Sequence, residues 1–228
     1  MDIKSVFNSS FDHIDTVCLA ISRLDINRAQ QHTGLLYFDG DCVNFLHLAW
    51  HDTLQQDPPD KNYLWLDIPI DPANKIHFAT YCAMIYENNK DGIPYGLSLD
   101  GSDFSENGNF IQKKPHVGLT CATFVLRVFH AQGFNIIDFE KWPSQEEDKK
   151  WQLKIIGILK QYVSSEYFNS QYEKILSGVA RFKPEEIVVA GTLLNPPYGH
   201  DEIKEYVNTL LESIINHANK TANDSHIS

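Results

Sequence analysis

The sequence predicts an α+β fold in which a small antiparallel sheet packs against helices. The β-rich segments cluster in the first third of the chain, and the segments with helical periodicity follow them. The chain has 228 residues, of which 43% are hydrophobic, so it is long enough to bury a core of its own. We therefore expect residues 1–228 to form a single domain.

Three segments have the composition of strands. Residues 32–38 and 42–51 are rich in β-branched, aromatic and leucine side chains, and they flank the turn Asp39-Gly40-Asp41. This arrangement predicts a β-hairpin. Residues 63–70 predict a third, short strand that prolines terminate.

Helical patterns dominate the rest of the chain. The clearest pattern, at residues 201–217, has apolar side chains at helical spacing on a single face, as expected of a helix packed against a domain. Clusters of turn residues separate the patterned segments. The expected helices cover residues 76–87, 121–132, 145–163, 165–176, 184–190 and 201–217, and the clusters of turn residues fall at 55–62, 88–94, 100–115 and 195–199.

Charge and cysteine spacing exclude several classes of function. The formal net charge of −11 disfavours unassisted binding to nucleic acid or anionic lipid, which needs clustered cations. The cysteines at positions 18, 42, 82 and 121 have neither the spacing of a zinc ribbon nor the density of a disulfide scaffold. No segment has the length of a membrane span, and the start does not resemble a secretory signal, so we expect a cytoplasmic location unless a non-classical route exports the chain.

Cys121 is the cysteine best placed for chemistry. It falls in the first turn of the helix expected at residues 121–132, where the helix dipole and free N–H groups lower a thiol pKa and favour the nucleophilic thiolate. The same N–H groups can bind a developing oxyanion. The small Ala122 and Thr123 leave the sulfur accessible. A buried, inert cysteine is the alternative.

A thiol nucleophile needs a base, and the predicted hairpin carries three histidines, His32, His47 and His51. A two-residue turn at Gly40-Asp41 would give opposite residues a constant index sum of about 81, from the antiparallel pairing rule. His32 then shares a face with both other histidines, whereas a three-residue turn would separate them. Gly34 has no Cβ, and we expect the helix that carries Cys121 to approach the strand there.

These motifs resemble the circularly permuted papain-like thiol hydrolases, the branch of the NlpC/P60 superfamily that includes the lecithin:retinol acyltransferase-like and YiiX-like proteins. His32-Thr33-Gly34-Leu35-Leu36-Tyr37 resembles the strand motif that begins with a histidine, and Leu46-His47-Leu48-Ala49 resembles the motif of the return strand. Thr120-Cys121-Ala122-Thr123-Phe124-Val125 resembles the Asn-Cys-x-x-Phe-Val motif, with threonine in place of the asparagine. The order of histidine, histidine and cysteine is that of the permuted branch.

The resemblance implies a permuted papain-like fold in which a small antiparallel sheet packs against the cysteine helix. Cys121 would be the nucleophile, His32 the general base and His47 the third member of the triad, with His51 next to Asp52 as the competitor for that role. The catalytic core would span residues 30–132, extra helices at 133–218 would form a cap or packing layer, and 219–228 would be a flexible tail.

We therefore expect a cysteine-dependent hydrolase or acyltransferase that acts through a thioester on an amide, peptide or acyl ester, without a cofactor. One alternative is an isopeptidase of the PPPDE type, which would act on ubiquitin-like conjugates. Another is a catalytically silent binding or immunity-type protein on the same scaffold. A metal site is disfavoured because His47 and His51, although four residues apart, would lie about 13 Å apart along a strand. The sequence does not specify the oligomeric state or the substrate.

Overall fold

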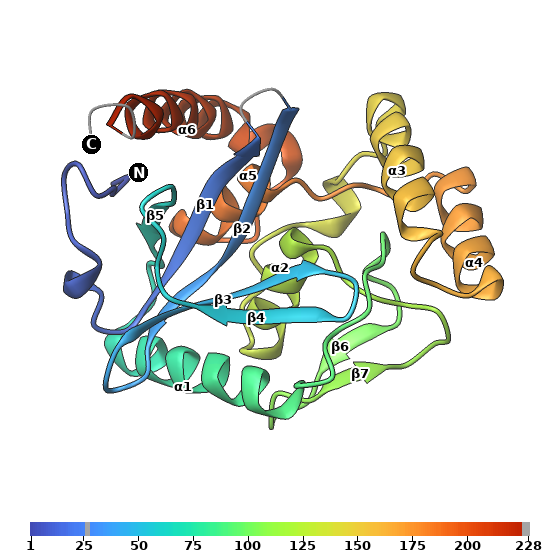
Figure 1. The fold of residues 1–228 in the computed structure, drawn as a ribbon, viewed down its shortest axis with the longest axis horizontal. Coiled ribbons are helices and arrows are strands. Elements are labelled where there is room, and N and C mark those ends of the chain that lie inside the picture. Colours follow the sequence, from blue (N-terminus) through green and yellow to red (C-terminus); the bar gives the residue numbers. More distant parts are fainter. Residues whose placement is uncertain (26–27, 225–228) are drawn as a thin grey trace.

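A five-stranded antiparallel sheet is the centre of the fold in the computed structural model, which describes residues 1–25 and 28–224 (Figure 1). The strand order is β4-β3-β2-β1-β5, so neighbouring strands are mostly sequential along the chain. A two-stranded sheet of β6 and β7 lies apart from it. The strands are β1 (Val17–Asp25), β2 (Arg28–Phe38), β3 (Val43–Trp50), β4 (Thr53–Asp57), β5 (Leu64–Asp67), β6 (Ser102–Phe104) and β7 (Phe110–Gln112). The class is α+β, as predicted.

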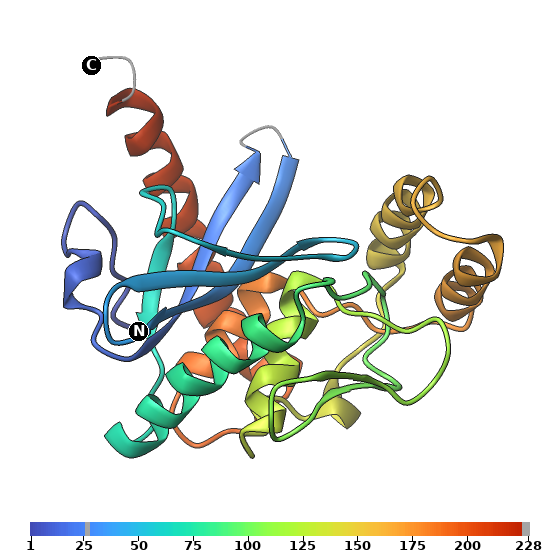
Figure 2. The same ribbon diagram turned by 60° about the horizontal axis from the view of Figure 1, so that its bottom comes forward.

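The six α-helices of the described residues divide into a group against the sheet and a separate pair. Helices α1, α2 and α5 contact strands of the large sheet, and α6 contacts α5 and β1. Helices α3 and α4 pack on each other and project from the body of the molecule, as Figure 2 shows. The helices are α1 (Pro72–Asn88), α2 (Cys121–Ala131), α3 (Glu146–Leu159), α4 (Ser165–Leu176), α5 (Pro184–Thr192) and α6 (Lys204–Asp224), with short 3₁₀ turns at Phe11–His13, Phe139–Lys141 and His200–Ile203.

Alternation along the strands divides the apolar side chains between the two faces of the sheet. Leu35 of β2 and its odd-numbered neighbours belong to the main core, together with Phe124 of α2 and Ile187 of α5. Leu36 points the other way and packs with Phe45 in a smaller cluster covered by the N-terminal segment. Both faces of the central strands are therefore buried.

Of the two turn lengths that the sequence left open, the structure has the two-residue turn. Leu35 lies opposite Leu46 and Phe38 lies opposite Val43, which are pairs with an index sum of 81. The N–H of Asp39 donates to the carbonyl of Cys42 at 3.2 Å, which closes a two-residue turn. The histidines therefore have the relative phase that the even loop requires.

Two strands of the sheet were not predicted. Strand β1 is a central strand, although the predicted core began only at residue 30, and β4 covers part of a segment predicted as a break. The polar sequence of β4, Thr-Leu-Gln-Gln-Asp, hides an edge strand whose side chains are mostly half-buried. The predicted strand at 42–51 ends one residue early, at Trp50, and the one at 63–70 is only four residues long.

The C-terminal helices correct the predicted boundaries. Helix α6 continues to Asp224, so residues 219–224 are helical and do not belong to the predicted flexible tail 219–228. The reason is that Thr221 is buried and its hydroxyl donates to the carbonyl of His217, one turn earlier. Residues 225–228 lie outside the described residues.

Helix α5 belongs to the core and not to a cap. Its residues Ile187, Val188 and Val189 are fully buried, and the helix packs against β1 and β2. The predicted core at 30–132 is therefore too short. Of the predicted cap at 133–218, only α3 and α4 form a peripheral layer. In the part of the chain that the structure describes, no helix is both long and apolar enough to span a membrane.

Candidate active site

Cys121 is the first residue of α2, as predicted, and the local sequence fixes it there. Thr120 is the N-cap: its hydroxyl accepts from the N–H of Thr123, and the Thr123 hydroxyl accepts from the N–H of Thr120 at 2.7 Å. The carbonyl of Thr120 then accepts the first helical bond from Phe124. This leaves the N–H groups of Cys121 and Ala122 without an intrahelical acceptor.

The thiol is held at the junction of α2 and β2. The backbone N–H groups of Thr33 and Ala122 lie close enough to the Cys121 sulfur to lower the pKa of its thiol. Thr33 directly follows His32, so β2 brings a donor to the sulfur from the residue next to the predicted base. The residue Cys121 is half-buried, whereas Cys18 and Cys82 are buried.

Cys121 and His32 line the same pocket. Its walls come from the β2–β3 hairpin, from the first turn of α2, from the loop at Tyr95, from α3 and from the segment that leads into α5. The lining residues are Gln30, Gln31, His32, Leu48, Ala49, Trp50, Tyr95, Thr120, Cys121, Ala122, Trp151, Arg181, Phe182 and Pro184.

A line of polar side chains leads away from this pocket. The Nε2 atom of His32 lies 2.8 Å from Nδ1 of His47, and Nε2 of His47 lies 3.0 Å from a carboxylate oxygen of Asp57. Both histidines are buried, while the Asp57 side chain is half-exposed. The structure thus brings His32 and His47 together and adds a carboxylate from β4.

The hydrogen bonds assign the tautomers. An ionised carboxylate only accepts hydrogen bonds, so His47 carries its proton on Nε2 and donates it to Asp57. Nδ1 of His47 is then an acceptor, and Nε2–H of His32 donates to it. As a consequence, Nδ1 of His32 carries a free lone pair, which is what a general base requires.

Gly34 makes the histidine contact possible, but in a different way from the one predicted. A Cβ at this position would lie 2.5 Å from the carbonyl oxygen of Leu46, 2.7 Å from Cβ of His47 and 2.7 Å from the ring of Phe45. Strand β3, and not the cysteine helix, therefore fills the space left by the missing side chain. The atoms nearest to the missing side chain thus belong to the return strand of the hairpin, while α2 also contacts β2.

Burial determines the protonation states of the resting site. Desolvation, helped by the nearby His47, lowers the pKa of His32 to about 3, and desolvation also lowers the pKa of His47 despite its bond to Asp57. Desolvation raises the pKa of the Cys121 thiol to about 11, although the N–H groups of Thr33 and Ala122 act in the opposite direction. The predicted low-pKa thiolate is wrong for the resting state, because burial outweighs the helix terminus.

His51, the competitor for the third position, has a different environment. It lies in the turn after β3, where its Nδ1 accepts from the N–H of Tyr95 at 3.1 Å and its Nε2 lies 3.2 Å from Asp52. A register shift between Leu48 and Trp50 precedes this turn. His51 therefore joins the β3–β4 turn to the Tyr95 loop, away from the contact between His32 and His47.

Three residues of the site escaped the sequence reasoning. Asp57 lies in the unpredicted strand β4, opposite Phe45 and diagonal to His47. Trp151 and Arg181 reach the pocket from α3 and from the segment before α5. Both segments fall in the predicted cap at 133–218. Only Asp57 carried a usable signal, since an acid followed by Pro58-Pro59 suggests the end of an edge strand.

No family model, curated protein or solved structure shows significant similarity to this chain. Among the described residues, no group of three or more histidine, cysteine, aspartate or glutamate side chains is arranged to hold a metal ion.

Proposed function

We propose that the protein is a thiol hydrolase or acyltransferase with Cys121 as nucleophile, His32 as general base and His47 as the residue that orients His32. The supporting observation is the line from Asp57 through His47 to His32, which ends in the pocket that Cys121 lines. Buried titratable side chains with strongly shifted pKa values that end in a pocket are candidates for proton transfer.

The first step would begin from a neutral pair. As the sulfur of Cys121 attacks the substrate carbonyl carbon, the thiol proton moves to Nδ1 of His32. The C–S bond forms while the carbonyl π bond opens to an oxyanion. The imidazolium of His32 keeps its bond to His47, and the negative charge of Asp57 stabilises the pair.

The second step would release the leaving group. The oxyanion collapses to a thioester, and the departing amine or alkoxide takes the proton from His32. Water or an acceptor nucleophile, with His32 again as base, then cleaves the thioester and regenerates the thiol. The backbone N–H of Cys121, which has no intrahelical acceptor, is suited to hold the oxyanion in both steps.

This chemistry fits the permuted papain-like fold that the sequence motifs resemble, with His47 rather than His51 as the third residue. An amide or peptide carbonyl is the substrate class that we favour. Isopeptide bonds of ubiquitin-like conjugates remain within that class.

The proposal is tested by alkylating the protein with iodoacetamide and measuring the labelling of each cysteine by peptide mass spectrometry. Cys42 is exposed and serves as an internal control. We expect His32→Gln to slow the labelling of Cys121 by about tenfold or more, because the thiol loses its base, and to leave Cys42 unchanged.

Equal labelling of Cys121 in the wild type and in His32→Gln would refute the role of His32. A His51→Gln variant is the matched control, since His51 faces Asp52 and Tyr95 and is expected to retain wild-type labelling. A protein whose Cys121 does not react at all would be the catalytically silent scaffold.

A further inference from the structure

A single arginine shares the pocket with the thiol. Arg181 lines the pocket, and its side chain is mostly buried. Its cation lowers the pKa of the Cys121 thiol, which places the two groups within electrostatic range of each other. The chain carries a net charge of −11, so a positive group at this position stands against the general field of the molecule.

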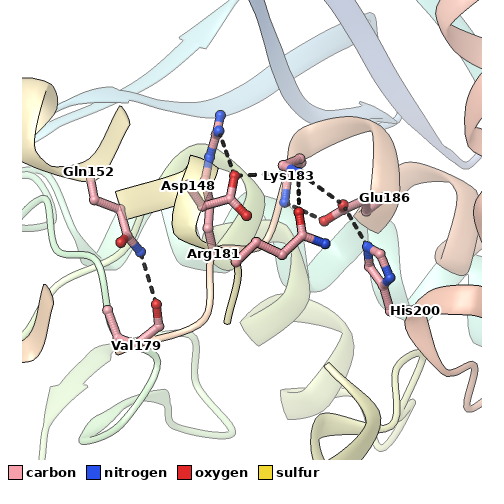
Figure 3. A network of polar contacts seen from close by, with 8 residues as sticks. Asp148, Gln152, Val179, Arg181, Lys183, Glu186 and His200 are labelled. Atoms are coloured by element: carbon pink, nitrogen blue, oxygen red, sulfur yellow. Dashed lines mark hydrogen bonds and ion pairs between the residues drawn. The ribbon is translucent and has the colours of Figure 1, made fainter. Parts of the chain in front are cut away.

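The guanidinium is held in a fixed orientation. Its carbon lies 3.7 Å from the ring centroid of Trp151, and Nη1 donates to a carboxylate oxygen of Asp148 at 3.2 Å. Figure 3 shows Arg181 next to Asp148 within a polar network that extends to Glu186 and His200. Stacking and one hydrogen bond fix the plane of an arginine without using most of its donors.

Asp148 does not pair with Arg181 exclusively. The same oxygen lies 3.3 Å from Nζ of Lys183, so Asp148 contacts two cations, and Lys183 also lies 3.8 Å from an oxygen of Glu186. A guanidinium has five N–H donors in a planar fork that matches a carboxylate. Among the described residues, Asp148 is the one side chain that accepts a hydrogen bond from Arg181.

A buried acid, Glu185, lies within electrostatic range of Arg181. Glu185 is more than nine-tenths buried, and its Oε2 atom has no hydrogen-bond partner within the described part of the chain. Burial raises the pKa of Glu185, which favours a neutral carboxyl group. A neutral carboxyl group does not compensate the positive charge of Arg181.

We propose that Arg181 forms a carboxylate-binding subsite next to Cys121, so that the enzyme acts on acyl or peptide substrates with a carboxylate close to the reacting carbonyl. This inference rests on the proposed function, because it assigns a specificity to the same nucleophile. Arg181 would bind the carboxylate through the edge of its fork that Asp148 leaves free, and Trp151 would keep that edge directed at the pocket.

The test compares two alkylating agents that differ in one charge. Iodoacetate and iodoacetamide deliver the same reacting carbon, but only iodoacetate has a carboxylate attached to it. We expect the ratio of the two rates to be about tenfold higher at Cys121 than at Cys42 of the same molecule, as a charge-assisted hydrogen bond would give.

Arg181→Gln should lower the ratio at Cys121 to that of Cys42. Arg181 also lowers the pKa of the Cys121 thiol, so the iodoacetamide rate falls as well, but the ratio of the two rates cancels this shared effect. Lys183→Gln is the matched control: it removes the other cation that shares Asp148, but Lys183 does not line the pocket. The inference is wrong if Arg181→Gln leaves the ratio unchanged, or if Lys183→Gln lowers it equally.

A wild-type measurement covers the case in which Arg181→Gln does not fold. Acetate should protect Cys121 from iodoacetamide, whereas acetamide at the same concentration and ionic strength should not, and Cys42 should be protected by neither. Absence of protection by acetate would overturn the subsite. A failure of the proposed function gives a different result: the iodoacetamide rate of Cys121 would then be the same in the wild type and in His32→Gln.

Discussion

The buried neutral His32 should make the stability of the protein depend on pH. Its side chain is 5% exposed, and its pKa falls from 6.5 to about 3 on folding. Between these values the unfolded chain binds a proton that the folded protein does not. The contribution of neutral His32 to the free energy of unfolding is therefore complete above pH 6.5, and it is lost as the pH falls towards 3.

The size of the effect follows from the shift in pKa. Each unit corresponds to 1.36 kcal/mol, so the full window amounts to about 5 kcal/mol and the interval from pH 6.5 to 4.5 to about 3 kcal/mol. Urea unfolding followed by tryptophan fluorescence at pH 7.5 and pH 4.5 measures the difference for the wild type and for His32→Gln. The variant lacks this titration, and its pH dependence should be smaller by about 3 kcal/mol.

A matched control and a refuting result complete the experiment. His13→Gln changes an exposed histidine and should keep the pH dependence of the wild type. His47 and His217 also have lowered pKa values, so some dependence on pH should persist in His32→Gln. A difference between the wild type and His32→Gln of less than about 1 kcal/mol would show that His32 is not buried in its neutral form.

Two further substitutions test the positioning of the histidines. Gly34→Ala should destabilise the protein by about 2 kcal/mol and slow the alkylation of Cys121, because the new Cβ would collide with the backbone of β3 and displace His47. Gly157→Ala, where a Cβ meets open space in α3, is the control and should be neutral or stabilising in the same urea titration. Asp57→Asn should lower the rate of Cys121 alkylation by about tenfold, because the half-exposed carboxylate no longer stabilises the protonated histidine pair. An unchanged rate in Asp57→Asn would show that Asp57 has no role in activating Cys121.

The sequence was most informative where local signals determine the structure. The parity rule linked the length of the turn at Gly40-Asp41 to the pairing of the histidines, and the observed two-residue turn brings His47 to His32. Thr120 directly before Cys121 predicted the start of α2, which the capping hydrogen bonds confirm. Both features depend on residues that are neighbours in sequence.

Features that depend on tertiary packing were not predictable in the same way. The raised pKa of Cys121 results from burial by elements far along the chain, which the dipole argument does not include. Arg181 enters the site because α5 packs in the core, and the sequence does not reveal this route. Asp57 is similar: its role depends on pairing of β4 with β3, for which a polar edge strand gives little signal.

The most direct test of the central claim is the detection of an acyl group on the sulfur of Cys121. Incubation with p-nitrophenyl acetate, followed by rapid acid quenching and peptide mass spectrometry, reports where the acetyl group resides. We expect an initial burst of p-nitrophenolate with acetylation of Cys121, no burst in Cys121→Ala, and a burst slower by at least about tenfold in His32→Gln. Acetylation confined to other residues, or a burst that persists in Cys121→Ala, would contradict the assignment of Cys121 as the nucleophile.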